Sequence, residues 1–341
     1  MPEATIIMTV YNGEAYIAEA IGGVLAQTCP DWELIVINDG STDRSGEIAR
    51  GYGDPRIRVV DRPNQGQPAS RNYAASIAQA PYLAICDADD VWCPEKLQRQ
   101  LDYVRAHRDV GVAGVRRILM INAVGEPLGV HMTPGSDGRL RRALARGVNP
   151  FTHSALVWRA EVFHRLGGYN LRFLYSQDFE MLLRAQDVCR LANVDGPPLL
   201  KYRVSGGAIS QSKRAVQAGY KKAAMVLAQR RRQGGADDVE AALAQCLPKP
   251  SEGPAPAGPG GAAAGAPPAR DLNLSYAKVA MACGSPWRAA RFLVRSVRQR
   301  FRPHLALLAL VVVLVPGPIL RGLYRGLVRL YRGWTEGTGP L

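Results

Sequence analysis

The sequence predicts an α/β fold around a mainly parallel sheet, and two observations support this prediction. The first 90 residues alternate short β-branched apolar runs with helix-like segments, which is the pattern of βαβ units. Polar residues lie at the carboxyl ends of three of the apolar runs, at Thr9, at Asp39 and at 87–90. Because ligands bind beyond the carboxyl ends of the strands in open α/β sheets, one crevice is expected to collect these side chains.

The elements of this sheet can be assigned in chain order. The predicted strands are Thr5–Val10, Trp32–Asn38, Arg56–Val60 and Tyr82–Cys86, and the predicted helices are Gly13–Gln27, a second after the turn Asp39–Asp43, and Gln67–Gln79. Asn12 is expected to cap the first helix, since Asn is a favoured N-cap residue. Ala15, Ala18 and Ile21 begin an apolar stripe with helical spacing in this segment.

The following segments mix shorter strands with helices. The predicted strands are Val112–Met120, Ser154–Trp158 and Leu199–Val204, and the predicted helices are Gln177–Gln186, Lys213–Arg232 and Asp237–Cys246. Pro, Gly and Ala dominate 248–270, which indicates a flexible linker. We therefore predict a head domain over 1–212, a helical extension over 213–247, the linker over 248–270, and a helical basic and apolar tail over 271–341.

The net charge of +14 is concentrated at the end of the chain. Residues 1–212 contain 23 basic and 23 acidic residues, whereas residues 284–341 contain 10 basic residues and one acidic residue. A neutral head argues against nucleic acid as a partner. The apolar run Leu305–Val315, within the apolar stretch 303–320, is shorter than the roughly 20 residues that span a bilayer. We expect peripheral contact of 286–333 with an anionic membrane; the alternative is docking of this segment on the head.

The cysteines and the N-terminus predict a cytoplasmic location. The six cysteines show neither C-x-x-C spacing nor the clusters of a zinc site, so we interpret them as reduced thiols. The sequence starts without the basic and apolar regions of a secretory signal. With the tail, this predicts a protein at the inner face of the cell membrane.

The acidic turn 87–90 is a candidate metal site. Carboxylates crowded at one strand end repel one another unless a cation lies among them. Mg²⁺ or Mn²⁺ typically takes one or two carboxylates and completes its coordination with phosphate and water oxygens, so Asp87 and Asp89 imply a diphosphate ligand. The alternative is a solvated turn that caps the helix beginning near 94–96.

Several sequence blocks together resemble glycosyltransferase family 2. They are Ile6–Gly13, Gln27–Asp43, Asn64–Gly66, Ala69–Asn72 and Asp87–Asp90, in this order, within a likeness that covers roughly 4–210. The resemblance implies a GT-A fold, which is a Rossmann-like mixed sheet flanked by helices. It also implies a nucleotide-sugar donor, a divalent metal (Mn²⁺ or Mg²⁺) and inversion at the anomeric carbon.

The resemblance also assigns roles to residues. Thr9 and Tyr11 would line the base and ribose pocket, Asp39 would contact the nucleobase, Arg71 would lie near the donor phosphates, Asp87 would hold the ribose or sugar, and Asp89 would be the principal metal ligand. For Arg71 the alternative is an arginine on a helix surface. Asn38 departs from the acid that the family often has there, although an amide can still hydrogen-bond a ribose or base.

An inverting transfer needs a base near the acceptor hydroxyl, and Asp178 is the candidate. It matches the Asp of the family's E-D motif, but Gln177 replaces the Glu and removes a charge beside the base. The alternative for Asp178 is a helix N-cap.

Three further residues carry weaker assignments. His153 resembles a residue of the acceptor floor, and its alternative is a structural histidine. Trp92 either covers the sugar or fills the core. Arg203, followed by Gly206, Gly207 and Ser210, resembles the family's closing loop over the diphosphate.

The predicted function is transfer of a sugar, with a UDP-sugar as the expected donor, onto a saccharide or lipid-linked acceptor in the synthesis of surface polysaccharide or glycolipid. A sugar nucleotidyltransferase is a first alternative, although Tyr11–Glu14 lacks the glycine-rich, basic triphosphate loop which that activity requires. A catalytically silent scaffold at the membrane is the second.

Overall fold

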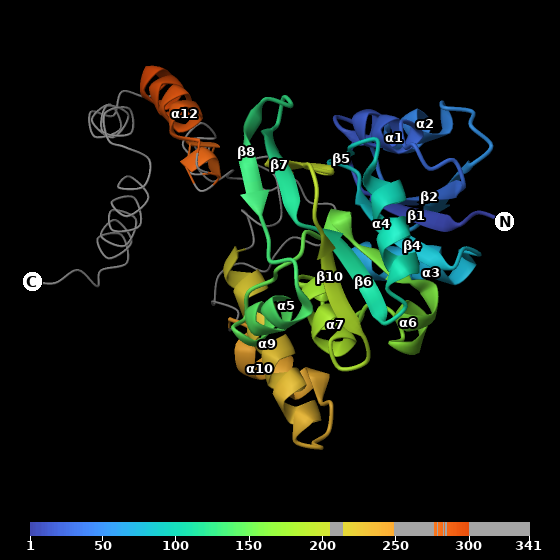
Figure 1. Cartoon of the computed structure of the whole chain (residues 1–341), viewed down its shortest axis with the longest axis vertical. Helices are drawn as coiled ribbons and strands as arrows, with labels where there is room; N and C mark the ends of the chain where they lie inside the picture. The colour runs from blue at the N-terminus through green and yellow to red at the C-terminus, as the bar shows by residue number, and fades with distance from the viewer. Residues whose placement is uncertain (205–213, 249–275, 278, 282, 284, 300–341) are drawn as a thin grey trace, which may run out of the picture. The chain divides into compact units, whose positions relative to one another are not determined.

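The structure is a computed structural model that describes residues 1–204, 214–248, 276–277, 279–281, 283 and 285–299 (Figure 1). These residues form two compact units. The larger comprises Met1–Ile118, Met132–Tyr202 and the described residues from 214 to 248; the smaller comprises Leu119–His131, 203–204 and the described residues from 276 to 299. Most of the predicted linker, the Gly206–Ser210 part of the predicted closing loop and the apolar stretch 303–320 lie outside the described residues.

The larger unit is built on a mixed seven-stranded sheet with the order β10-β6-β9-β4-β1-β2-β3. The strands are β1 (Ala4–Val10), β2 (Trp32–Asp39), β3 (Ile57–Arg62), β4 (Tyr82–Asp87), β6 (Val110–Val115), β9 (Val157–Arg159) and β10 (Arg190–Val194). Strand β9 is antiparallel to both of its neighbours, β4 and β6, whereas the other pairs are parallel. The predicted α/β class with a mixed sheet is therefore confirmed.

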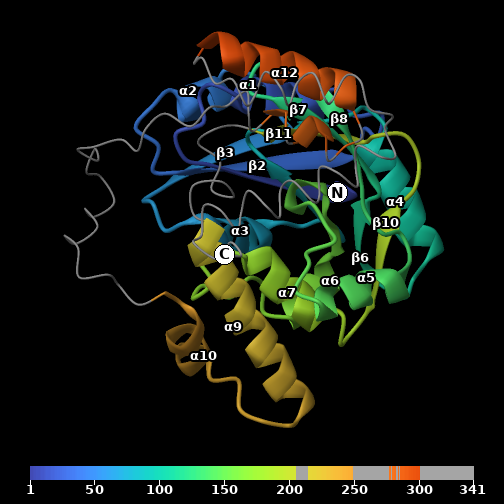
Figure 2. The same cartoon turned by 90° about the vertical axis from the view of Figure 1, so that its left-hand side faces the viewer.

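Helices cover both faces of this sheet. The helices of the larger unit are α1 (Ile17–Leu25), α2 (Ser45–Arg50), α3 (Gln67–Ile77), α4 (Lys96–Ala106), α5 (Asp137–Ala145), α6 (Ala160–Arg165), α7 (Gln177–Ala185), α9 (Arg214–Arg232) and α10 (Val239–Cys246). Helix α9 packs against α7, and α10 packs against α9. Figures 1 and 2 show α1 and α2 on one face of the sheet and α3 on the opposite face. A short antiparallel pairing joins β5 (Val91–Trp92) to Leu200 and Lys201 of β11 (Leu200–Val204), and the last two residues of β11 belong to the smaller unit.

The period of two along the strands determines which polar side chains meet. Ile7 in β1, Ile37 in β2 and Ile85 in β4 all belong to the hydrophobic core on the α3 face, together with Ala74 and Ala75 of α3. Because alternate residues of a strand point to the same face, the next positions in step are Thr9, Asp39 and Asp87. All three therefore point to the α3 face at the carboxyl ends of their strands.

The first helix begins later than predicted, and Asn12 does not cap it. Helix α1 starts at Ile17 after the N-cap residue Tyr16. Asn12 has a left-handed backbone (φ 51°), and its Oδ1 accepts a hydrogen bond from the Thr42 N–H at 2.8 Å. The side chain thus joins the loop after β1 to the loop after β2. Because its Oδ1 is used in this contact, Asn12 does not serve as the helix cap.

The predicted strand Val112–Met120 is two strands. The chain bends at Arg116, whose guanidinium forms an ion pair with Asp195, and β6 ends at Val115. Strand β7 (Arg117–Asn122) then turns into β8 (Pro127–Met132), and most of this hairpin belongs to the smaller unit, as does α12 (Pro286–Gln299). Among the described residues, no helix has the length and apolar character needed to span a membrane. All six cysteines are free thiols.

Candidate active site

Arg71 and Asp87 form the centre of the site. The buried stripe of α3 consists of Ser70 and Arg71, then Ala74 and Ala75 one turn later, so the polar pair lies over the strand ends. The Arg71 Nη2 donates to Asp87 Oδ1 at 2.7 Å, and Nη1 donates to Gln67 Oε1 at 3.1 Å. The Arg71 side chain is 2% exposed, so it is not an arginine on a helix surface. Its charge is held in place by these hydrogen bonds.

His153 and Tyr169 extend this centre. His153 Nε2 lies 2.8 Å from the Tyr169 hydroxyl, and Nδ1 lies 3.8 Å from Asp87 Oδ1, too far for a hydrogen bond. Burial and the neighbouring Arg71 hold the pKa of His153 well below its ordinary value. His153 is therefore neutral near pH 7 and adds no positive charge beside Asp87. Asn72 of α3 binds the Tyr169 backbone at both its N–H and its carbonyl.

Asp178 lies in the first turn of α7. The helix begins at Gln177 after Ser176, which has a left-handed backbone (φ 57°), so Asp178 is the second helical residue and not the N-cap. Asn149 Nδ2 donates to Asp178 Oδ2 at 2.6 Å. Burial raises the pKa of Asp178, and this rise is opposed by the Phe179 N–H, by Arg71 and by Asn149. A carboxylate with a raised pKa is a stronger base than an ordinary one.

Gln177 connects the Asp178 side of the site to the Arg71 side. Its Nε2 lies 3.5 Å from Gln67 Oε1, the oxygen that also accepts from Arg71. Arg71 therefore contacts Asp87 directly and acts electrostatically on Asp178, while Gln67 lies between Arg71 and Gln177. The structure brings Asp87, Arg71, Gln177, His153 and Asp178 into one region.

Asp39 is engaged by the loop that precedes α3. Its carboxylate accepts the Gln65 N–H and the Gly66 N–H, both at 3.0 Å, and the Ser70 hydroxyl at 2.7 Å. Gly66 has φ 83°, a conformation that favours glycine and lets this loop fold back onto Asp39. Asp39 therefore positions the start of α3. Any contact of Asp39 with a nucleobase would be an addition to these three hydrogen bonds.

Thr9 and Tyr11 lie at the end of β1. Thr9 pairs in register with Asp87 across β1 and β4. The buried Thr9 Oγ1 has no hydrogen-bond partner among the described residues, which leaves a polar atom beside the acidic turn. Tyr11 is 49% exposed at the start of the following loop. Tyr11 is therefore accessible to a ligand at the strand ends, whereas Thr9 is covered.

The acidic turn meets the chemical requirements of a divalent cation with few protein ligands. Asp87 and Asp89 are partly buried carboxylates at the end of β4, and the contacts of Asp87 with Arg71 and His153 use Oδ1. Within the described ranges, no group of three or more His, Cys, Asp or Glu could hold a metal on its own. Phosphate and water oxygens would therefore complete the coordination, as is usual for Mg²⁺. The N-cap of α4 is Glu95, so the turn does not supply it.

Trp92 and Arg203 are buried. Trp92 is 1% exposed and donates from Nε1 to the Ser154 carbonyl at 3.0 Å, so it fills the core. Lys96 Nζ lies 3.6 Å from the centroid of the Trp92 ring. Arg203, in the smaller unit, donates to the carbonyls of Asn122 and Ala123 in the hairpin. The donor-lid role assigned to Arg203 remains a prediction.

Sequence reasoning missed the partners of the site residues. Asn149, Ser154 and Tyr169 were not singled out, although Ser154 Oγ accepts the Asp87 N–H at 3.0 Å. A weak signal was available for Tyr169, because it follows Gly167 and Gly168, both with φ 72°. Nothing near Asn149 in the sequence indicates its contact with Asp178.

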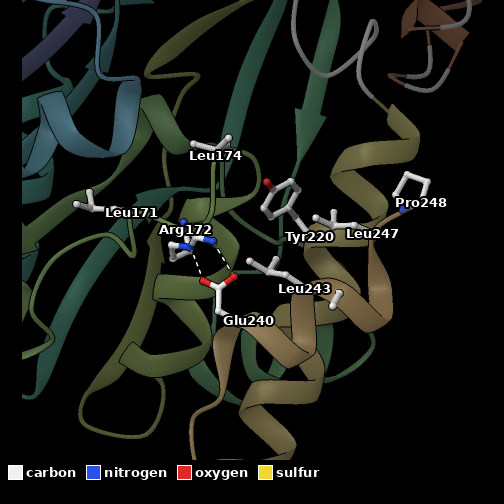
Figure 3. Close-up of a pocket in the computed structure, with 9 residues that line it drawn as sticks. Leu171, Arg172, Leu174, Tyr220, Glu240, Leu243, Leu247 and Pro248 are labelled. Carbon is white, nitrogen blue, oxygen red and sulfur yellow. Dashed lines mark hydrogen bonds and ion pairs between the residues drawn. The ribbon is translucent and has the colours of Figure 1, made fainter. Parts of the chain in front are cut away.

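An open groove of about 500 Å³ lies beside the loop that leads to Asp178 (Figure 3). It is lined mainly by apolar side chains, and the ion pair between Arg172 and Glu240 lies at its side: Leu171, Arg172, Leu174, Tyr220, Glu240, Leu243, Ala244, Leu247 and Pro248. The Tyr220 ring packs edge-on against Phe173 and Tyr175, which belong to the same loop. The loop that precedes α7 therefore both lines the groove and leads directly to Asp178.

Curated proteins with similar sequences carry glycosyltransferase names. EpsE of Bacillus subtilis (strain 168), provisionally named a glycosyltransferase, is 31% identical over 199 residues, which are 54% of this chain and 66% of that protein. TuaG of the same organism, provisionally named a teichuronic acid biosynthesis glycosyltransferase, is 39% identical over 106 residues, which are 30% of this chain and 42% of that protein. The chain thus spans less than two thirds of the length of these relatives.

A solved structure shares the fold. Staphylococcus aureus TarS (1-349), crystallised in complex with UDP-GlcNAc, matches with a TM-score of 0.55 and 19% identity over 72% of this chain and 70% of that chain. The larger unit therefore has the GT-A fold that the sequence predicted. The family model for glycosyl transferase family 2 matches residues 5–167, which hold the acidic turn, Arg71 and His153. Residues 5–167 of this chain therefore belong to glycosyl transferase family 2.

Proposed function

We propose that this chain is a glycosyltransferase that moves a sugar from a nucleoside diphosphate to an acceptor hydroxyl with inversion at the anomeric carbon. One observation carries the proposal: the buried Arg71 is hydrogen-bonded to Asp87 on the donor side and, through Gln67 Oε1, is linked to Gln177 beside Asp178 on the acceptor side. A single fixed cation thus serves both reacting partners. Family membership is consistent with this activity.

On the donor side, Thr9, Tyr11 and Asp39 would line the pocket for the base and ribose. Asp87 would hold the ribose or the sugar, and Arg71 would face the phosphates. The Arg71 guanidinium is oriented before the donor binds, so it can stabilise the charge of the leaving diphosphate without reorganising.

Asp89 would be the principal ligand of Mn²⁺ or Mg²⁺, with Asp87 beside it. Such a cation, when bound, supplies Lewis-acid stabilisation of the leaving diphosphate. Carboxylate oxygens are the ligands these hard cations prefer, and two of them suffice where phosphate completes the coordination.

On the acceptor side, Asp178 would remove the proton of the attacking hydroxyl. Its raised pKa favours proton uptake, and the hydrogen bond from Asn149 fixes the carboxylate orientation. Gln177 carries no charge, so Asp178 has no acidic neighbour at that position. The acceptor oxygen then forms a bond to the anomeric carbon as the bond from that carbon to the diphosphate oxygen breaks, and the nucleoside diphosphate leaves with the bonding electron pair.

For the substrates, a UDP-sugar is the proposed donor and a saccharide or lipid-linked acceptor the proposed partner. The crystal structure of TarS with UDP-GlcNAc supports a UDP-sugar as the donor, and the name of TuaG, which refers to teichuronic acid biosynthesis, supports surface polysaccharide as the product class. The apolar groove beside the Asp178 loop would suit the hydrocarbon part of a lipid-linked acceptor.

Calorimetric titration of UDP, with and without Mn²⁺, tests the proposal on the parent chain and on Asp89→Asn. We expect Mn²⁺ to strengthen UDP binding and Asp89→Asn to abolish that dependence. The matched control Asp187→Asn removes an exposed carboxylate elsewhere and should bind as the parent does. If the folded chain bound none of UDP, dTDP, GDP and CDP, the silent-scaffold alternative would replace this function. Turnover of a UDP-sugar would exclude the silent-scaffold alternative.

A further inference from the structure

Helix α12 is strongly amphipathic, and its apolar side is already buried within the smaller unit. Ala289, Phe292 and Leu293 are at most 3% exposed. The Phe292 ring packs edge-on against Tyr276, with 5.4 Å between the centroids. These contacts leave the opposite side of the helix facing outward.

Two ion pairs fix the orientation of α12 against the hairpin. Arg291 Nη2 lies 3.4 Å from Glu126 Oε1, and Arg295 Nη1 lies 3.0 Å from Glu126 Oε2. Glu126 belongs to the turn between β7 and β8, in the same unit as the helix. Because the helix is held on its buried side and by these pairs, its outward side is a defined surface.

The outward side combines apolar and basic residues. Trp287, Arg291 and Val294 have the spacing i, i+4 and i+7 of a single helical stripe, and their exposures are 70%, 63% and 43%. Arg288 is also exposed, and the sequence of α12 contains no acidic residue. An exposed tryptophan beside arginines is a costly surface in water, since a large apolar ring gains by being covered.

This composition fits an anionic lipid surface. Tryptophan favours the headgroup region, where its ring and its N–H both find partners, and arginines gain from anionic lipids. With 14 residues, α12 is about 21 Å long, shorter than the roughly 30 Å hydrocarbon core, so it would lie along the surface. Arg291 lies between Trp287 and Val294 and would keep the stripe at headgroup depth, whereas a protein groove would favour an uninterrupted apolar stripe.

We propose that the outward stripe of α12 binds the surface of an anionic membrane, with Trp287 inserted among the headgroups and Arg288 facing lipid phosphates. This inference is independent of the proposed catalysis. It would hold the larger unit near acceptors that reside in the membrane.

Flotation of the full chain with vesicles tests the proposal. One set of vesicles contains phosphatidylcholine alone, and the other contains phosphatidylcholine and phosphatidylglycerol in equal amounts. We expect flotation only with the anionic vesicles, and a blue shift of tryptophan emission that Trp287→Ser removes. Arg288→Gln should weaken binding about fivefold, since an arginine near an anionic surface contributes roughly 1 kcal/mol.

Arg58→Gln, an exposed arginine of β3 in the larger unit, is the matched control and should float as the parent does. UDP titration and circular dichroism of each variant separate a folding or active-site defect from a loss of membrane contact. Equal flotation with both vesicle types, or unchanged flotation of Trp287→Ser and Arg288→Gln, would overturn the proposal. So would failure of the folded parent to float, which would favour an acidic protein as the partner of α12.

Discussion

Replacement of Asn149 by alanine tests whether Asp178 is the base. Asn149 donates the only side-chain hydrogen bond to Asp178 found among the described residues, at 2.6 Å. A hydrogen bond to a charged group contributes roughly 1.5–3 kcal/mol, so its loss should shift the ionisation equilibrium of Asp178 about ten- to a hundredfold toward the acid. The lower end is expected, because the amide also hydrogen-bonds the protonated acid.

The direction of the pH effect follows from this shift. Burial already raises the pKa of Asp178, and Asn149 opposes the rise, so Asn149→Ala raises that pKa further. Because the base must be ionised, the acidic limb of the kcat/KM profile should move to higher pH, and activity should recover on the alkaline side. The carbon-13 signal of the Asp178 carboxyl, assigned with Asp178→Asn, reports the same shift without a substrate.

Asn122→Ala is the matched control. Asn122 also donates to a carboxylate, Glu126 Oε2 at 2.9 Å, but it lies in the smaller unit. Its replacement should leave the acidic limb and the Asp178 signal unchanged. A uniform loss of activity in Asn149→Ala at every pH, with an unshifted Asp178 titration, would refute the assignment of Asn149 as a positioning residue for an ionising base.

Two further predictions concern buried charges beside the site. Glu180 is 1% exposed and forms an ion pair with Arg184 at 2.8 Å, so Glu180→Gln should lower the free energy of unfolding, measured in urea, by about 3–5 kcal/mol. The control Glu161→Gln changes an exposed carboxylate and should alter the free energy of unfolding little. A loss below about 1 kcal/mol in Glu180→Gln would contradict the prediction. Burial lowers the pKa of Lys96 from 10.5 to about 7, so the native state gains stability as pH rises between these values. Lys96→Met should therefore raise Tm most at and below pH 7, and this increase should become smaller toward pH 10.5. The control is Lys222→Met, which replaces an exposed lysine. If the change in Tm of Lys96→Met depended on pH as little as that of Lys222→Met, the prediction would be wrong.

Strands β1, β2 and β4 could be predicted because their apolar runs are buried on both faces, whereas β3 lies at the edge of the sheet and is only partly buried. Ala4–Val10 is buried throughout, and such a run has few alternatives in an α/β fold. The start of α1 could not be predicted in the same way. The side chain of Asn12 can accept a hydrogen bond either from the first turn of the helix or from the loop after β2, and that loop is distant in sequence. Local propensity alone does not decide this competition.

The antiparallel strand β9 illustrates a different limit. Val157–Arg159 has only three residues, and its place between β4 and β6 depends on pairing with segments far along the chain. The same strand follows the turn that carries His153 and Ser154. The contact of Ser154 with Asp87 thus depends on topology, which periodicity does not reveal. The sequence motifs predicted that Asp87 lies at the end of its strand, but they did not reveal that Ser154 contacts it.

Asp39 shows how one acid can position a site without touching the reacting atoms. Its three hydrogen bonds hold the loop before α3 and the Ser70 side chain, and Ser70 is adjacent to Arg71. Since α3 carries Arg71 toward Asp87, the carboxyl end of β2 and that of β4 are linked through the first turn of one helix. Loss of the Asp39 carboxylate would therefore loosen the Arg71 guanidinium, which under the proposed function would face the diphosphate. A defect in diphosphate binding after replacement of Asp39 would not by itself establish contact between this residue and a base, and binding of a free nucleoside, which lacks phosphates, distinguishes the two roles.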